Sequence, residues 1–168
     1  TVSREAGSRM NTSQALVPGS LSAIAQREGI SIAESFMSAD VICIVDVSGS
    51  MSTCDSRGGR KRYDVACDEL RALQSTLPGK IAVVAFSDHA EFCPHGTPVY
   101  QGGGTDLADA FRFVQVADGT VRFIVISDGE PENEQEVLRV ARQFKSRIDC
   151  IYVGPEDYRA GAQFLEQL

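Results

Sequence analysis

Three oxygen-bearing side chains stand at alternate positions in one short stretch of this sequence. Asp46, Ser48 and Ser50 directly follow residues 41–45, an apolar and mostly β-branched run. Such a run is typical of a central strand in a parallel sheet, where both faces are covered. Hard divalent cations prefer oxygen ligands, and Mg²⁺ usually takes one or two carboxylates and keeps several waters. The stretch therefore indicates a divalent-cation site at the end of a strand.

Two later loops carry matching side chains. Thr105 follows the glycines at 102–104, and Asp128 follows the apolar run 120–126. Open α/β sheets place their sites at the carboxyl ends of the strands, so these loops are expected to share one edge. Glycine would let the second loop approach a cation closely, and the cation would remove the repulsion between two carboxylates. The predicted metal ligands are Asp46, Ser48, Ser50, Thr105 and Asp128.

Strands alternate with helices through the rest of the chain. Apolar runs predict strands at 41–45, 81–86, 120–126 and 148–153, and a short antiparallel edge strand at 90–93. Helical periodicity predicts a helix at 63–77 and another that begins after Thr105-Asp106. A third is predicted with Pro131 in its first turn, and a fourth with Asp157 as its N-cap. This order predicts an α/β fold, Rossmann-like and doubly wound. It has a mostly parallel central sheet, one antiparallel edge strand and helices on both faces.

The predicted domain occupies residues 40–168. Residues 1–17 are expected to be a tail, with the part before Met10 attributed to cloning. Capping and apolar patterns predict two short helices as an N-terminal extension at 18–39. A chain of 168 residues is long enough for one domain with a sizeable core.

Charge and cysteine usage restrict the class of partner. The net charge of −7 argues against a nucleic-acid partner, since phosphates require a basic surface. No apolar run is long enough to cross a bilayer, so no membrane partner is expected. Five scattered cysteines without a CxxC pair, and the lack of a signal-peptide pattern, favour a reducing, cytoplasmic location.

Three sequence motifs occur in the order found in a known family. The segments DVSGSM, GGGTDL and SDGEP begin at residues 46, 102 and 127. Together they resemble the metal-ion-dependent adhesion site (MIDAS) of von Willebrand factor type A (vWA) domains. The resemblance implies that Ser48, Ser50 and Thr105 bind the metal directly, while Asp46 and Asp128 bind it through water or directly. It implies Mg²⁺, with Mn²⁺ and Ca²⁺ as alternatives.

The same resemblance implies a protein-interaction module and not an enzyme. A partner's exposed Asp or Glu would complete the metal coordination, and the partner could be an AAA-type ATPase or another complex subunit. The loop after Ser50 carries four cations that could attract such an acid, or could simply be solvated: Arg57, Arg60, Lys61 and Arg62.

Other functions remain as alternatives. A metal-dependent phosphohydrolase could use Asp46 as a nucleophile, although Ser48 stands where such enzymes have a second aspartate. An extracellular adhesion domain is a further alternative, which an intact disulfide or a signal sequence would favour. The remaining alternative is a zinc site at Cys54, His89, Cys93 and His95. These residues do not have the spacing of a standard zinc site. Nucleophile-elbow and Walker motifs are absent from the sequence.

Overall fold

The computed structural model describes residues 39–77 and 80–168. The tail expected at 1–17 and the helices expected at 18–39 therefore lie outside the described residues, apart from Ala39. Within the described part of the chain, no helix combines the length and apolar character needed to cross a membrane.

The central sheet has five strands in the order β5-β4-β1-β6-β7. Their bounds are Val41–Asp46 for β1, Ile81–Phe86 for β4, Ala90–Phe92 for β5, Arg122–Ser127 for β6 and Ile148–Tyr152 for β7. Neighbouring strands run parallel, except that β5 pairs antiparallel with β4 at one edge. The predicted mostly parallel sheet with one antiparallel edge strand is confirmed.

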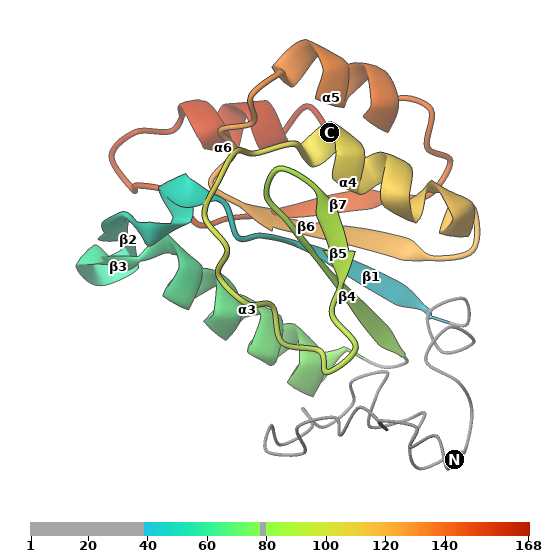
Figure 1. The fold of residues 1–168 in the computed structure, drawn as a ribbon, viewed down its shortest axis with the longest axis horizontal. Coiled ribbons are helices and arrows are strands. Elements are labelled where there is room, and N and C mark those ends of the chain that lie inside the picture. The colour runs from blue at the N-terminus through green and yellow to red at the C-terminus, as the bar shows by residue number, and fades with distance from the viewer. Residues whose placement is uncertain (1–38, 78–79) are drawn as a thin grey trace, which may run out of the picture.

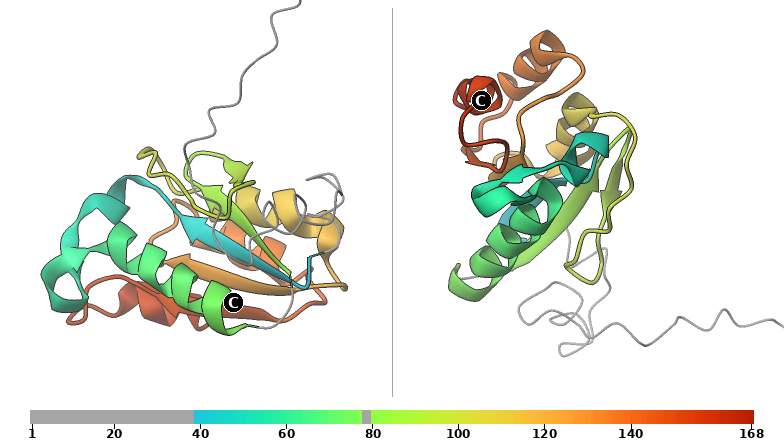
Figure 2. Two further views of the ribbon diagram at one scale, coloured as in Figure 1. Left: turned by 90° about the horizontal axis from the view of Figure 1, so that it is seen from below. Right: turned by 90° about the vertical axis from the view of Figure 1, so that its left-hand side faces the viewer.

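Helices cover both faces of this sheet (Figure 1). One face carries α3, and the other carries α4, α5 and α6, an arrangement that is also visible from the side in Figure 2. The helices span Arg62–Thr76 (α3), Leu107–Val114 (α4), Glu134–Ala141 (α5) and Ala160–Leu165 (α6). Short 3-10 turns lie at Gly49–Ser52, Arg57–Gly59 and Gln115–Ala117.

The core forms two layers because alternate residues of a strand point to opposite faces. In β1, Ile42 and Ile44 pack into the layer under α4, α5 and α6. Val41, Cys43 and Val45 pack into the layer under α3. This strand is buried on both faces, and that explains its continuous apolar sequence.

Two helix starts differ from the prediction. α5 begins at Glu134, and Asn133 caps it by accepting a hydrogen bond from the backbone N–H of Glu136, so Pro131 lies before the helix. α6 follows Arg159 without a side-chain cap, so Asp157 does not cap it. By contrast, Asp106 caps α4, as the Thr105-Asp106 pair indicated. Cap residues also favour turns, so their presence alone does not mark the first helical residue.

A small hairpin between β1 and α3 was not predicted. Strands Cys54–Ser56 (β2) and Arg60–Lys61 (β3) pair antiparallel. Gly58 and Gly59, between them, adopt positive φ angles of 68° and 72°. The strands are too short for a period-two pattern, so only the glycine pair signals this turn.

Candidate metal centre

The loops after β1 and before α4 dock on each other through the backbone. The carbonyl of Val47 accepts hydrogen bonds from the N–H groups of Gln101 and Gly102, at 3.2 and 3.0 Å. The N–H of Gly49 donates to the carbonyl of Gly103 at 2.9 Å. β1 is the central strand; the chain passes from it to β4 and β5 on one side and then crosses to β6 on the other. Its carboxyl end is therefore the switch point where such sheets bind ligands.

Two hydrogen bonds, one long and one short, join three of the predicted ligands in series. The hydroxyl oxygens of Ser48 and Ser50 lie 3.4 Å apart, and the hydroxyl of Ser50 donates to Oδ2 of Asp128 at 2.6 Å. Oδ1 of Asp128 accepts the backbone N–H of Glu130 at 3.2 Å. Ser48 and Asp128 are buried, whereas Ser50 is partly exposed. Oxygens from the ends of β1 and β6 thus meet at one point that solvent can reach through Ser50.

Asp46 lies beneath this chain of hydrogen bonds. Its Oδ1 accepts the backbone N–H of Ser48 at 3.0 Å, and its Oδ2 accepts the hydroxyl of Ser127 at 2.7 Å. Burial, and next the neighbouring carboxylate of Asp128, raise the pKa of Asp46 above its usual value. Two buried carboxylates in proximity carry a charge that a bound divalent cation would stabilise.

Thr105 belongs to the loop that docks on the β1 end. It is buried, its N–H donates to Oε1 of Glu132 at 3.3 Å, and its carbonyl accepts the N–H of Glu132 at 3.1 Å. It lies two residues after Gly103, which bonds to Gly49. The structure therefore brings the Thr105 loop beside the loop that carries Ser48 and Ser50, through backbone contacts to Val47 and Gly49.

A Cβ at position 104 would displace the carboxylate ends of two flexible side chains. A Cβ at Gly104 would lie 2.0 Å from Oε1 of Glu132 and 2.6 Å from Oδ1 of Asp88. Asp88 accepts the N–H of Gly104 at 2.8 Å. Two exposed carboxylates thus flank the site on this side, and both are tied to the backbone of the glycine loop.

Arg62 is the main residue of this region that the sequence analysis did not place in the site. Its Nη1 lies 2.9 Å from Oδ2 of Asp128 and 3.0 Å from Oε2 of Glu130. Its Nε and Nη2 bind the two carboxylate oxygens of Asp55 at 2.7 and 2.8 Å. Only 7% of the side chain is exposed. Above all Asp55, and then Asp128 and Glu130, raise the pKa of Arg62, so it is a permanent cation.

One sequence signal could have identified Arg62. It is the first residue of α3, and cations are disfavoured at helix N-termini because of the helix dipole. An arginine in that position implies a compensating anion. The other arginines of the loop are paired as well, Arg57 with Glu69 and Arg60 with Asp68. This internal pairing weakens the attraction that the loop could exert on an acidic partner.

The donor set fits a hard cation. It consists of two carboxylates and three hydroxyls, all oxygen ligands of the kind that Mg²⁺ and Mn²⁺ accept. Within residues 39–77 and 80–168, no group of three or more His, Cys, Asp or Glu side chains is arranged to hold a metal. A cation at the end of β1 would therefore depend on the hydroxyls. The five predicted ligands stay a prediction.

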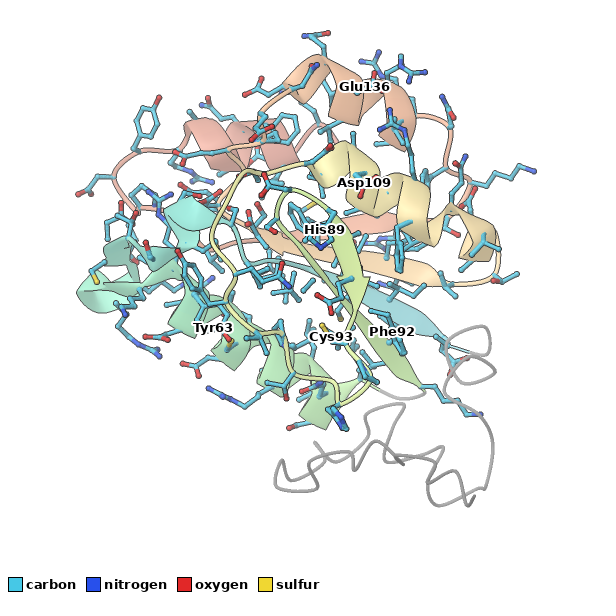
Figure 3. All side chains as sticks on the ribbon, in the orientation of Figure 1. Tyr63, His89, Phe92, Cys93, Asp109 and Glu136 are labelled. Atoms are coloured by element: carbon cyan, nitrogen blue, oxygen red, sulfur yellow. The ribbon has the colours of Figure 1, made fainter. Side chains whose placement is uncertain are left out.

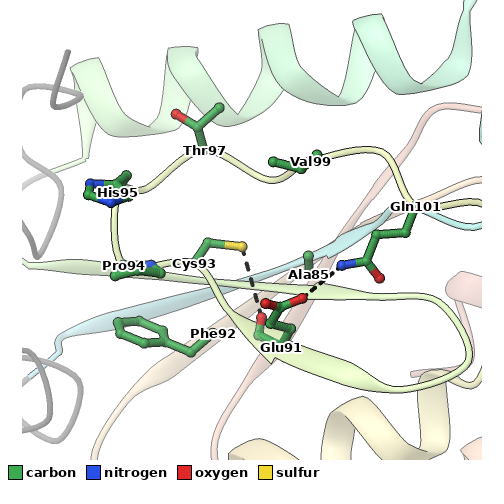
Figure 4. A pocket seen from close by; sticks show the side chains of 9 residues that line it. All are labelled: Ala85, Glu91, Phe92, Cys93, Pro94, His95, Thr97, Val99 and Gln101. Carbon is green, nitrogen blue, oxygen red and sulfur yellow. Dashed lines mark hydrogen bonds between the residues drawn. The ribbon is translucent and has the colours of Figure 1, made fainter. Parts of the chain in front are cut away.

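Within the described residues, the four candidate zinc ligands do not form one cluster. His89 precedes β5 and Cys93 follows it, so they lie at opposite ends of that strand (Figure 3). Cys93 and His95 instead line a cavity of about 140 Å³ between β5 and the following loop, where Gln101 donates to Glu91 at 2.8 Å (Figure 4). Burial raises the pKa of Cys93 to about 11, so its thiol is protonated at neutral pH. All five cysteines lie in the described residues and are free.

Comparison with known proteins shows similarity at the level of the fold. Neither a protein-family model nor a curated protein sequence matches this chain. The aerotolerance-related membrane protein of Bacteroides fragilis, solved with multiple mutations to serine, matches with a TM-score of 0.51 and 17% identity. That match covers 68% of this chain and 67% of that protein. The manganese-loaded TRAP protein of Plasmodium vivax matches with a TM-score of 0.52 and 19% identity, over 76% of this chain and 63% of that protein.

These matches confirm a vWA-like α/β fold for this chain. The chain spans about two thirds of the length of the two proteins. Their low sequence identity limits the conclusion to the fold.

Proposed function

We propose that this domain binds a partner protein through a divalent cation held at the carboxyl end of β1, with Mg²⁺ or Mn²⁺ as the cation. The hydrogen-bonded series Ser48, Ser50 and Asp128 carries the proposal, because it joins oxygens from two loops that are 78 residues apart. When bound, the cation would supply an electrophilic centre for an incoming oxygen ligand. Ser48, Ser50, Thr105, Asp46 and Asp128 would hold it.

The charges around the site favour an acidic ligand that binds only when the cation is present. The three hydroxyl ligands carry no charge. The chain therefore supplies a divalent cation with little negative charge beyond the two carboxylates. The exposed carboxylates of Asp88 and Glu132 flank the site and would repel a partner's acid. The cation reverses this repulsion, and a partner's Asp or Glu is therefore the ligand that we propose.

One of the matched folds offers indirect support. The TRAP protein of Plasmodium vivax was solved in a manganese-loaded form. A fold of this type can therefore be prepared with a divalent cation. This supports Mn²⁺ as a first probe for the present chain.

We expect Mg²⁺ or Mn²⁺ to raise the melting temperature of this domain, because the folded state alone assembles the ligands. At a metal concentration 100 times the Kd, the expected stabilisation is about 2.7 kcal/mol. The double variant Ser48→Ala, Asp128→Asn should lose this gain, while asparagine keeps the shape of the aspartate. Differential scanning fluorimetry with and without EDTA measures the effect.

The matched control is Ser75→Ala, Asp68→Ala, which removes the same two residue types from the exposed side of α3. It should keep the full metal-dependent shift. A shift of equal size in the Ser48→Ala, Asp128→Asn variant would contradict the proposal. So would a wild-type protein whose melting temperature does not respond to either metal.

Tyr100 is expected to contribute to partner binding beside the metal. Its hydroxyl lies 3.4 Å from the carbonyl of Gly49, and its ring contacts that of Tyr63 edge to face, with centroids 5.8 Å apart. Tyr100 is nevertheless 41% exposed, and the adjacent Val99 is 61% exposed. A fixed, exposed aromatic ring near a binding site is typical of an interface hot spot.

Tyr100→Ala should therefore weaken partner binding by about tenfold, in the range found for interface tyrosines. Its metal affinity should stay unchanged, because the ring supplies no metal ligand. Biolayer interferometry against a partner isolated by metal-dependent pull-down measures the first quantity, and isothermal titration calorimetry measures the second. Val116→Ala, an exposed apolar residue beyond the far end of α4, should leave both unchanged.

A phosphohydrolase is less well supported. Both carboxylate oxygens of Asp46 accept hydrogen bonds, and its side chain is fully buried. A nucleophile needs an oxygen that faces the substrate, so this geometry favours a structural or metal-binding role. We propose that the domain has no catalytic activity, and turnover of an aryl phosphate that is lost in Asp46→Asn would contradict this.

A further inference from the structure

The guanidinium of Arg62 lies where it can take part in the metal chemistry of the site. Its Nη1 is 2.9 Å from Oδ2 of Asp128, the same oxygen that accepts the hydroxyl of Ser50 at 2.6 Å. The side chain of Asp128 is fully buried, so its negative charge requires a counter-charge. In this structure that counter-charge is Arg62.

Arg62 is held from its opposite side by other groups. Its Nε and Nη2 form a two-point contact with Asp55 of the β2–β3 hairpin, and Nη1 also reaches Glu130. Its contact with Asp128 is thus one among several. The side chain could release Asp128 and still keep a two-point ion pair and a second carboxylate.

A divalent cation that binds Oδ2 of Asp128 would compete with Arg62 for that oxygen. The lone pairs of Oδ2 already accept two donors, and Oδ1 accepts the N–H of Glu130. A cation bound at Oδ2 would also lie within several ångströms of the guanidinium. Two positive charges at that separation repel each other strongly in a partly buried site.

We propose that Arg62 is an internal counter-ion that competes with the divalent cation for Asp128. Binding of the cation requires Arg62 to release Asp128, while Asp55 and Glu130 keep the guanidinium beside the site. This inference rests on the proposed function of the same site. It extends that function to regulation, because the ion pair lowers the apparent metal affinity and stabilises the metal-free domain.

The competition has a direct thermodynamic consequence. If the metal-competent state is only a fraction of the metal-free population, the apparent Kd rises by the inverse of that fraction. Removing the guanidinium removes both this rise in the apparent Kd and the charge repulsion between Arg62 and the cation. The site would then bind metal more tightly but would be less stable without it, since Asp128 would be buried unpaired.

The test compares Arg62→Gln with wild type by isothermal titration calorimetry with MnCl₂. We expect the Kd of Arg62→Gln to fall by at least about tenfold. Its melting temperature in EDTA should fall, so its metal-dependent shift should be larger than that of wild type. Arg62→Lys keeps the positive charge but not the two-point contact with Asp55, and its Kd should lie closer to that of wild type than the Kd of Arg62→Gln does.

Arg60→Gln is the matched control. Arg60 belongs to the same basic loop but pairs with the exposed Asp68 at 2.7 Å. Its removal should change the Kd by less than about twofold, because exposed charges are screened by solvent and salt. An equal gain in Arg60→Gln and Arg62→Gln would show a general charge effect and would overturn the proposal.

A second measurement uses wild-type protein and does not depend on the folding of a variant. The Nε–H and Nη–H signals of the arginine side chains can be followed by NMR during titration with Mg²⁺. The Nη1 environment of Arg62 should change on metal binding, while its Nε–H, which faces Asp55, should stay protected from exchange. Metal binding that leaves the Arg62 signals unchanged would overturn the proposal.

The two hypotheses fail in different ways. Wild-type protein that binds neither Mn²⁺ nor Mg²⁺ would contradict the proposed function. Wild-type protein that binds metal, with an Arg62→Gln variant of equal or weaker affinity, would contradict only the role of Arg62.

Discussion

Gly161→Ala is expected to destabilise the folded domain by at least about 2 kcal/mol, as overpacking against a fixed neighbour does. Gly161 lies at the start of α6, and a Cβ there would sit 1.9 Å from the carbonyl oxygen of Asp128. It would also come within 3.1 Å of the ring of Tyr152. The clash involves backbone, so no side-chain rotation can relieve it.

The contact is reciprocal. A Cβ at Gly129 would lie 2.1 Å from the carbonyl oxygen of Gly161. The helix and the Asp128 loop therefore touch through their backbones, and moving α6 away would uncover the site loop. Because alanine has the higher helix propensity, any measured loss underestimates the cost of the clash.

Urea denaturation monitored by circular dichroism would measure this loss. Gly119→Ala is the control, because a Cβ there would meet nothing within 4 Å, although Gly119, unlike Gly161, has a positive φ of 84°. It should cost only about 1 kcal/mol, from backbone strain. Similar losses in both variants would show that the close approach of α6 is not important for stability.

Phe123→Ala should destabilise the domain by about 3–5 kcal/mol, which is a large share of the total for a domain of this size. Phe123 is fully buried in β6, in the core layer under α4, α5 and α6. Its ring lies edge to face against Phe144, with centroids 5.2 Å apart, and Phe144 contacts Phe111 at 5.4 Å. Truncation removes one ring of a three-ring cluster and leaves a cavity.

The midpoint of urea unfolding measures this effect, and Phe123→Leu should show a clearly smaller loss because leucine refills part of the cavity. The two variants form a graded pair at one position. A loss below about 1 kcal/mol for Phe123→Ala would mean that the surrounding core collapses around the smaller side chain. That result would contradict the close packing of the three rings.

The strands of this protein were predictable because their signal is local. β1 and β4 are uninterrupted apolar runs, and burial on both faces of the sheet requires such runs. The alternation of strands and helices then predicted a doubly wound sheet, with an antiparallel edge strand at residues 90–93. The carboxyl ends of β1 and β6 identified the loops that carry Asp46 and Asp128, whereas Thr105 lies in the long loop between the antiparallel strand β5 and α4.

The helix starts and the hairpin were less predictable. Asp157 and Pro131 are residue types that suit a cap or a first turn, yet they lie in the preceding loops. Local preferences at such positions are weak, and packing of the helix against the sheet decides where it begins. The β2–β3 hairpin depends on only a few residues and two glycines at positive φ.

The sequence by itself determined the strand order along the chain and the oxygen-bearing residues at the strand ends. Only the tertiary structure decided how their charges are balanced. Arg62 belongs to a sequence segment that resembles a solvated basic loop, but folding places it at the start of α3 and against Asp128, 66 residues away. Ion pairs of this kind leave no periodic trace in the sequence, because they depend on which loops the sheet brings together.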